Sequence, residues 1–178
     1  CQIHLRFVSG LLDSAKHPIY VVGNPSADLD SIISAIVYSY FAHQRIPASS
    51  PRSHIPLLNL EHIPSGPELC RLRPEFVKAL WLSTNSPAIS EDEKWENTPE
   101  SAGEFIKGHI ITVNDFASHL RHFGKDNEQL HADITMVDWN ALPIRKERGT
   151  GSLTGIENVL FTVVGYLDHH DDEKFVPH

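Results

Sequence analysis

The feature that most constrains the fold is a short buried-strand pattern followed directly by a long helical one. Residues 19–22, Ile-Tyr-Val-Val, predict a buried strand, and Gly23 allows a sharp exit from it. Residues 30–44 are apolar almost all round, which predicts a helix buried deep in the domain and closed at Pro47. Because such strand and helix patterns alternate along the chain, we expect an α/β domain with a largely parallel sheet.

Two further helices and one irregular segment are predicted. Residues 7–16 show helical spacing that Pro18 ends, and residues 73–82 predict a helix with Pro74 near its first turn. The polar, breaker-rich stretch 83–103 predicts a mobile surface excursion.

The remaining apolar runs predict the other strands. Residues 54–60 predict a strand that Pro56 would place at a sheet edge. Three more strands are expected at 109–113, 134–137 and 163–167. Residues 117–132 can supply one crossover helix, whereas 141–160 is ambiguous and predicts a mostly irregular connection.

Size and cysteine content suggest one reduced, cytoplasmic domain. At 178 residues and 20.0 kDa the chain suits a single domain over 1–178. No apolar run approaches the roughly 20 residues that a membrane span needs, so we expect no membrane crossing. The chain begins at Cys1 rather than Met, which suggests a trimmed or partial chain. Cys1 and Cys70 form no close-spaced pair, as expected of a reduced protein.

The charge balance disfavours nucleic acid as a substrate. The formal net charge is −8 and the pI about 5.8, and no basic stripe that could replace phosphate counterions is visible. Small polyanions stay possible, because bound divalent cations can reverse the local field.

Acidic residues follow four of the predicted strands. They are Asp28 with Asp30, Asp115, Asp138 and Asp168. Ligands of open α/β sheets bind beyond the carboxyl ends of the strands, so these acids should converge with His169 and His170 at one edge. Oxygen-rich sites with an imidazole suit Mg²⁺ or Mn²⁺, and two such ions roughly 4 Å apart can clamp a phosphoryl group. The predicted chemistry is hydrolysis of a phosphate ester or anhydride.

Each of these features also has a structural interpretation. Residues 28–31 alone could be a helix N-cap, and 168–173 a solvated charged tail. Asp115 suits a loop or a cap, and Asp138 a turn. Trp139 is more typical of a packed aromatic than of a substrate platform. Only the ordered set, placed at strand ends, favours the functional interpretation.

Three segments in this order resemble a known family. Residues 21–31, 136–140 and 164–173 resemble the first three motifs of DHH phosphoesterases. The closest resemblance is to the fungal-type, eukaryotic exopolyphosphatase branch, related to Prune proteins and family II inorganic pyrophosphatases. The resemblance runs from about Ser14 to Glu173. It implies a three-layer domain, with helices flanking a mainly parallel sheet, that uses two Mn²⁺ or Mg²⁺ ions to release terminal phosphate from linear inorganic polyphosphate.

The resemblance also implies roles for individual residues. Asp28 would bind the first ion and Asp30 the second, and Asp138 would bridge both. His169 would complete the second ion's ligands, and His170 would lie near the substrate phosphate. These assignments make Asp138, His169 and His170 the expected catalytic residues.

Three neighbouring residues would have supporting roles. Asp168 would orient His169 or support the metal ligands without contacting the ions. Ser31 would support the ligands in the same way or lie near the substrate. Asn24 stands where pyrophosphatases of the family have a metal-binding His, and exopolyphosphatases of this branch resemble this sequence in having Asn, which favours polyphosphate. Trp139 departs from the usual His or Asn, and the stretch between Asp138 and Asp168 is longer than usual.

The family's fourth motif and its basic, substrate-gripping C-terminal domain do not appear before His178. We therefore expect this polypeptide alone to be weakly active or inactive. A catalytically dead binding or scaffold domain is the alternative that Trp139 and this ending favour. A phosphodiesterase or nuclease of the same superfamily is a third possibility, which Asn24 and the charge of −8 disfavour.

Overall fold

A computed structural model describes residues 17–44, 52–84, 106–107 and 110–176. The helix predicted at 7–16 lies outside these ranges, as does most of the excursion predicted at 83–103. Ser83 and Thr84 differ from that prediction, because they form the end of a helix.

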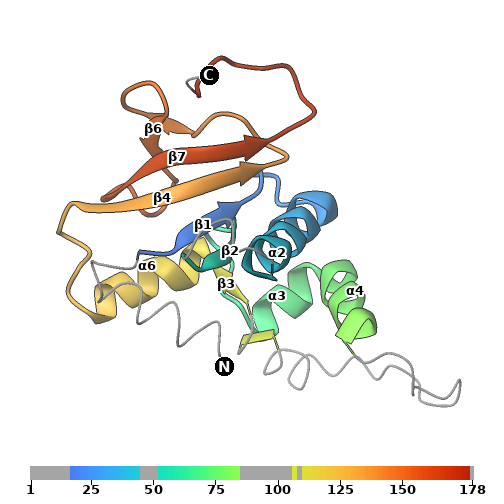
Figure 1. The fold of residues 1–178 in the computed structure, drawn as a ribbon. Helices are drawn as coiled ribbons and strands as arrows, with labels where there is room; N and C mark the ends of the chain where they lie inside the picture. The colour runs from blue at the N-terminus through green and yellow to red at the C-terminus, as the bar shows by residue number, and fades with distance from the viewer. Residues whose placement is uncertain (1–16, 45–51, 85–105, 108–109, 177–178) are drawn as a thin grey trace, which may run out of the picture.

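The domain is built on one seven-stranded sheet of order β3-β2-β1-β4-β7-β6-β5 (Figure 1). Its parallel strands are β1 (Ile19–Val22), β2 (His54–Leu58), β3 (Ile111–Thr112), β4 (Leu130–Val137) and β7 (Val159–Leu167). The short strands β5 (Ile144–Arg145) and β6 (Thr150–Ser152) extend it with antiparallel pairing. The mainly parallel α/β fold expected from the sequence is confirmed.

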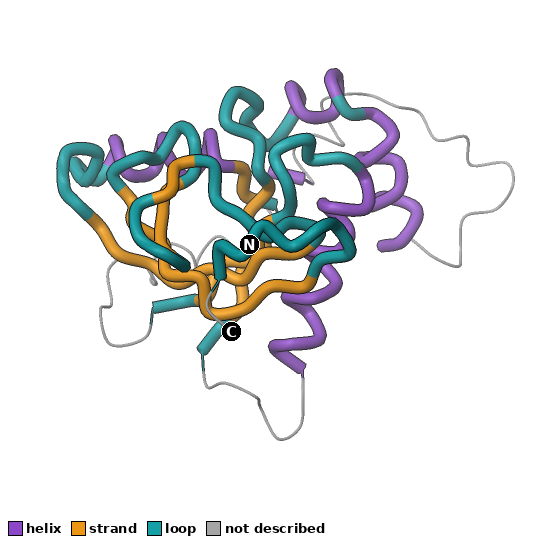
Figure 2. The backbone as a smooth tube through the Cα atoms, turned by 90° about the horizontal axis from the view of Figure 1, so that it is seen from above, coloured by secondary structure: helices purple, strands orange, loops and turns teal. Residues whose placement is uncertain are grey.

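Helices flank the sheet on both faces, and the view from above separates them from the strands (Figure 2). They are α2 (Leu29–Gln44), α3 (Pro67–Leu72), α4 (Pro74–Thr84) and α6 (Val113–His122). Side chains of β1 alternate between the faces: Tyr20 contacts the core on the α6 side, which includes Phe116, while Val21 packs with Ala35 of α2. The period-two alternation of a strand thus builds a three-layer domain.

Helix α2 is not buried deep in the domain, contrary to the prediction. It packs on the sheet through residues such as Ile32 and Ala35, each 1% exposed, but Tyr40 is 61% and Phe41 65% exposed. A helix in an outer layer touches the sheet along one side only, so an apolar composition all round does not by itself bury it.

The predicted edge position of Pro56 is wrong, because β2 lies between β1 and β3. Proline has no N–H for the ladder, but the register with β3 covers only Leu57 and Leu58. The proline therefore precedes the part of β2 that pairs with β3.

Two crossover predictions also need correction. The helix expected at 117–132 is α6, which begins four residues earlier at Val113 and ends at His122. Thr112 and Asp115 form a reciprocal capping box that starts it there. Residues 141–160 contain no helix, as expected, but they carry β5 and β6 rather than irregular chain alone.

No helix within the described ranges is long and apolar enough to cross a membrane.

Candidate metal centre

The carboxyl ends of β1, β4 and β7 deliver the predicted site residues to one edge of the sheet. The arrowheads of these strands point the same way, toward the start of α2 (Figure 1). Asn24 and Asp28 follow β1, Asp138 follows β4, and Asp168 with His169 follow β7. The convergence expected from a parallel sheet is therefore present at these three strands.

Gly23 lets the first turn of α2 approach the end of β1. A Cβ at this position would lie 2.8 Å from the Ser31 Cβ and 2.9 Å from the Ser31 carbonyl oxygen, closer than side chains tolerate. The glycine is thus required for the contact that places Ser31, itself 1% exposed, against the site.

Asp28 caps α2 and keeps its carboxylate at the surface. The Ser31 backbone N–H donates to Asp28 Oδ1 at 3.3 Å, and the Ser26 hydroxyl donates to Asp28 Oδ2 at 3.1 Å. Slight burial opposes ionisation, but hydrogen bonds from Ser31, Asp30 and Ser26 outweigh it and lower the pKa of the Asp28 carboxyl. The N-cap interpretation is confirmed, and it leaves an ionised, exposed oxygen donor at the sheet edge.

Asp138 is the buried centre of the site. Its backbone has φ of 55°, a left-handed conformation that aspartate tolerates, and its N–H donates to the Leu167 carbonyl at 2.8 Å. Its side chain is 7% exposed. Asp138 Oδ2 accepts from Asn24 Nδ2 at 2.7 Å and from the Ser31 hydroxyl at 2.5 Å. The other oxygen, Oδ1, is buried without a hydrogen-bond donor in the described structure.

Two groups of potential ligands share Asp138. We call them the acidic group (Asp28, Asp30, Asp138) and the histidine group (Asp138, Asp168, His169, His170); within each, one ligand atom per residue lies within 4.8 Å of the others. Asp138 Oδ1 is 3.4 Å from His169 Nδ1 and 3.9 Å from His170 Nδ1. The two imidazole rings stack with centroids 4.2 Å apart.

The donors in these groups fit divalent metal ions. Carboxylate oxygens suit Mn²⁺ and Mg²⁺ in proteins, and imidazole nitrogens bind divalent first-row transition-metal ions. A buried carboxylate oxygen without a donor is costly, and a bound cation would remove that cost. Asp138 Oδ1 is such an atom, and it belongs to the residue that the acidic and histidine groups share.

Asp168 holds His170. Asp168 Oδ1 lies 2.6 Å from His170 Nδ1, and Asp168 Oδ2 accepts from Asn140 Nδ2. Burial opposes ionisation of Asp168, but the hydrogen bonds from His170 and Asn140 outweigh it and lower the pKa of this carboxyl. The same contact with Asp168 raises the pKa of His170. The family resemblance had Asp168 orient His169 or lie behind the ligands, whereas this hydrogen bond goes to the neighbouring imidazole.

Two residues considered in the sequence have structural positions instead. Asp115 lies outside both ligand groups; its carboxylate accepts from the backbone N–H and hydroxyl of Thr112 and from the backbone N–H of Ser65. Only three of the four strand ends therefore contribute acids. Trp139 is half-buried and packs against the core on the α6 side, which confirms the packed-aromatic interpretation.

Sequence reasoning missed Asn140. This residue is 4% exposed and hydrogen-bonds to the segment after β7. Its position in the sequence, two residues after Asp138, was the signal that could have identified it as part of the site.

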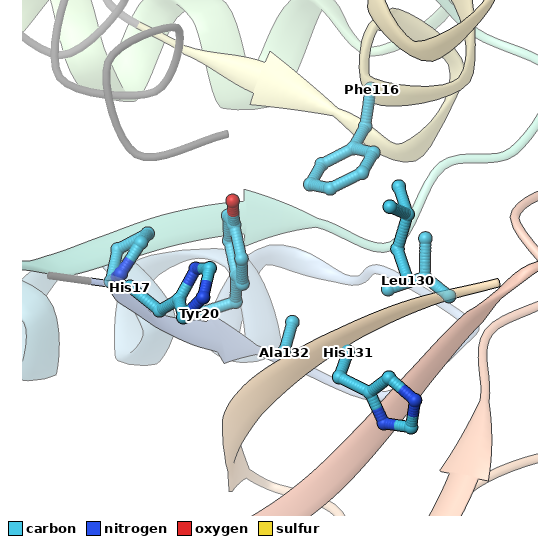
Figure 3. Close-up of a pocket in the computed structure, with 8 residues that line it drawn as sticks. His17, Tyr20, Phe116, Leu130, His131 and Ala132 are labelled. Carbon is cyan, nitrogen blue, oxygen red and sulfur yellow. The ribbon is translucent and has the colours of Figure 1, made fainter. Parts of the chain in front are cut away.

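A separate cavity of about 60 Å³ lies at the amino ends of β1, β4 and β7, on the sheet edge opposite the acids (Figure 3). Its walls are mostly apolar and include Tyr20, Phe116 and Leu130. It includes no member of either ligand group.

Comparison with known proteins gives one informative match. The chain is 28% identical over 170 residues to a protein of Schizosaccharomyces pombe (strain 972 / ATCC 24843) named "Putative exopolyphosphatase". The aligned region covers 96% of this chain and 33% of that protein, so the chain spans about a third of its relative's length. No family model and no solved structure matches significantly. The match supports a distant exopolyphosphatase-like relationship.

Proposed function

We propose that the chain carries the metal-binding part of a phosphoanhydride hydrolase that releases terminal phosphate from linear inorganic polyphosphate. The observation that carries the proposal is Asp138 Oδ1, a buried oxygen without a hydrogen-bond donor in the described structure, on the residue that the acidic group and the histidine group share. An oxygen in that position suits a carboxylate shared by two cations.

The ordered motifs and the fungal relative supply the substrate class. The relative's name specifies an exopolyphosphatase, and Asn24 agrees with that branch of the DHH phosphoesterases rather than with its pyrophosphatases. The chain spans about a third of that relative. The family resemblance implies that a basic domain outside the matched region would help to bind the substrate.

Individual residues of this chain would have different roles in the reaction. Two Mn²⁺ or Mg²⁺ ions, when bound, would supply the activation of water and the neutralisation of phosphate charge. Asp28 would bind the first ion, Asp30 and His169 would bind the second, and Asp138 would bind both. Asn24 and Ser31 keep Asp138 Oδ2 hydrogen-bonded and so direct Oδ1 toward the ions. His170, with a side chain 54% exposed, is accessible to a phosphate group.

The test combines Mn²⁺ titration by calorimetry with phosphate release from polyphosphate. We expect binding of two ions per chain, lost in Asp138→Ala, and release that depends on Mn²⁺ or Mg²⁺. Asp126→Ala, which removes an exposed acid outside both ligand groups, is the matched control and should leave both readouts unchanged. Absence of metal binding in the wild type would sink the proposal.

Release of phosphate is the second criterion. Metal binding without hydrolysis, even when the chain is joined to the remaining part of its fungal relative, would favour a catalytically dead binding domain instead. Hydrolysis of short oligonucleotides in preference to polyphosphate would favour a nuclease of the same superfamily.

A further inference from the structure

We propose that Asn140 is a positioning residue that holds the histidine group in its metal-binding arrangement. This inference rests on the proposed function, because it assigns a role within the same metal centre. Asn140 would touch none of the reacting atoms and would act through Asp168.

Among the described residues, the Asn140 side chain hydrogen-bonds to the segment that follows β7. Its Nδ2 donates to Asp168 Oδ2 and, at 3.0 Å, to the Asp171 carbonyl. Its Oδ1 accepts from the Glu173 backbone N–H at 3.4 Å. The side chain thus ties the end of β4 to residues 168–173 from a buried position, with 4% of Asn140 exposed.

The consequence for His170 follows from the two oxygens of Asp168. One accepts from Asn140, and the other contacts His170 Nδ1 at 2.6 Å. With one oxygen held by Asn140, the other has a defined direction, and this sets the orientation of the His170 ring. His169 stacks on that ring, so the positions of both imidazoles are linked to Asn140. Such hydrogen bonds behind the ligands fix ligand geometry and affinity in metalloproteins.

Asparagine suits this position because it offers a donor and an acceptor on a short, uncharged side chain. An aspartate would place a second carboxylate beside Asp168, and an alanine would leave both Asp168 Oδ2 and the Asp171 carbonyl without their donor.

The acidic group is supported by different contacts. Asp138 Oδ2 is held by Asn24 and Ser31, and Asp28 is held by the first turn of α2. Loss of Asn140 should therefore weaken the binding of one ion and leave the binding of the other unchanged. Loss of a residue important only for folding would instead change the stability of the domain without a difference between the two ions.

The experiment is a Mn²⁺ titration of the whole chain, with unfolding followed by circular dichroism. For Asn140→Ala and Asn140→Asp we expect one ion to bind as in the wild type and the other to bind about 10- to 100-fold more weakly. The matched control is Asn158→Ala, because the Asn158 amide also donates two hydrogen bonds, to the Lys125 and Glu128 carbonyls at 3.0 Å each, away from the site. That variant should still bind two ions.

A double variant identifies which ion is affected. If Asn140 acts through the histidine group, Asn140→Ala should add little to the loss of affinity already caused by His169→Ala. Additive losses would overturn the inference, as would two ions bound with wild-type affinity in Asn140→Ala. So would unfolding of both Asn140 variants under conditions where the Asn158 variant folds. A wild type that binds no Mn²⁺ would instead contradict the proposed function itself.

Discussion

The Ser31 hydroxyl donates a hydrogen bond of 2.5 Å to Asp138 Oδ2, joining the first turn of α2 to the end of β4 across 107 positions of the chain. Both residues are buried, Ser31 at 1% and Asp138 at 8% exposed. A buried carboxylate is costly unless it is hydrogen-bonded or paired with a cation. This contact and the one from Asn24 satisfy one oxygen of Asp138 and leave the other directed at the site.

Ser31→Ala should therefore lower both stability and metal affinity. Removing the hydroxyl takes one of two donors from a buried carboxylate, which costs about 1–3 kcal/mol in the free energy of unfolding. We expect Mn²⁺ to bind about 10- to 100-fold more weakly, since a contact behind a ligand is lost. Denaturant unfolding and calorimetry measure the two effects.

The control is Ser39→Ala in the same helix. Ser39 is also buried, at 3% exposed, but its hydroxyl donates at 2.7 Å to the Ala35 carbonyl within α2. Its removal should leave Mn²⁺ affinity unchanged. Equal effects of the two substitutions on Mn²⁺ binding would show that Ser31 does not position Asp138.

Gly23→Ala should disturb the junction between β1 and α2. The added methyl group would meet the Ser31 Cβ at 2.8 Å, and relieving such overlap costs about 1–3 kcal/mol of stability. Because the displaced atoms belong to Ser31, weaker Mn²⁺ binding should accompany the loss. Gly165→Ala is the control: its Cβ would lie 3.6 Å from Thr135 Oγ1, an ordinary contact, and its effect on unfolding should be small. A neutral Gly23→Ala would contradict the steric argument.

Asp138→Asn should affect stability with opposite signs in the absence and presence of metal. Without metal, at pH 8, the change removes a negative charge from a cluster of acids and should raise the free energy of unfolding by about 1 kcal/mol, the size of one charge contact at 4 Å in water. With Mn²⁺ at 100 times its dissociation constant, the wild type should gain about 2.7 kcal/mol. Thermal unfolding with and without Mn²⁺ measures this crossover, and a variant stabilised by Mn²⁺ as strongly as the wild type would refute it.

His54 should make the metal-free domain less stable in mild acid. Burial of its side chain, together with the charges of Arg52 and His43, outweighs a hydrogen bond with the Arg52 backbone and lowers the pKa of His54 from its usual 6.5. The unfolded chain then takes up the proton more readily than the folded one, so stability is lost as the pH falls from about 6.5 toward the folded pKa.

His54→Phe tests this dependence. The phenyl ring can keep the edge-on contact with Tyr38, whose centroid lies 6.3 Å away, but it cannot be protonated. Chemical unfolding between pH 7.5 and 5 should therefore show a shallower loss of stability than in the wild type. Replacing the exposed His131 with Asn should leave the wild-type slope, and an unchanged slope in His54→Phe would exclude His54 as its origin.

Local sequence patterns predicted the structure correctly where the prediction concerned a single strand or helix. The apolar run 19–22 is a strand, Pro74 opens a helix, and the acids after β1, β4 and β7 follow directly from those strand ends. The expectation that an acid after a strand joins the site failed for Asp115. An aspartate in that position can equally cap the next helix, and it does so here because Thr112 completes the capping box. Sequence patterns also failed for Tyr40 and Phe41, since composition does not reveal which side of a helix meets the sheet.

The order of the chain by itself determined that carboxylates and imidazoles would gather at one edge of a parallel sheet, because strand direction and chain order place every carboxyl end on the same side. Only the tertiary structure decided how they are held. Asn24 and Ser31 meet Asp138 over separations of 114 and 107 residues, and Asn140 meets Asp168 over 28. Such contacts depend on side-chain distances between different elements, which no local periodicity encodes.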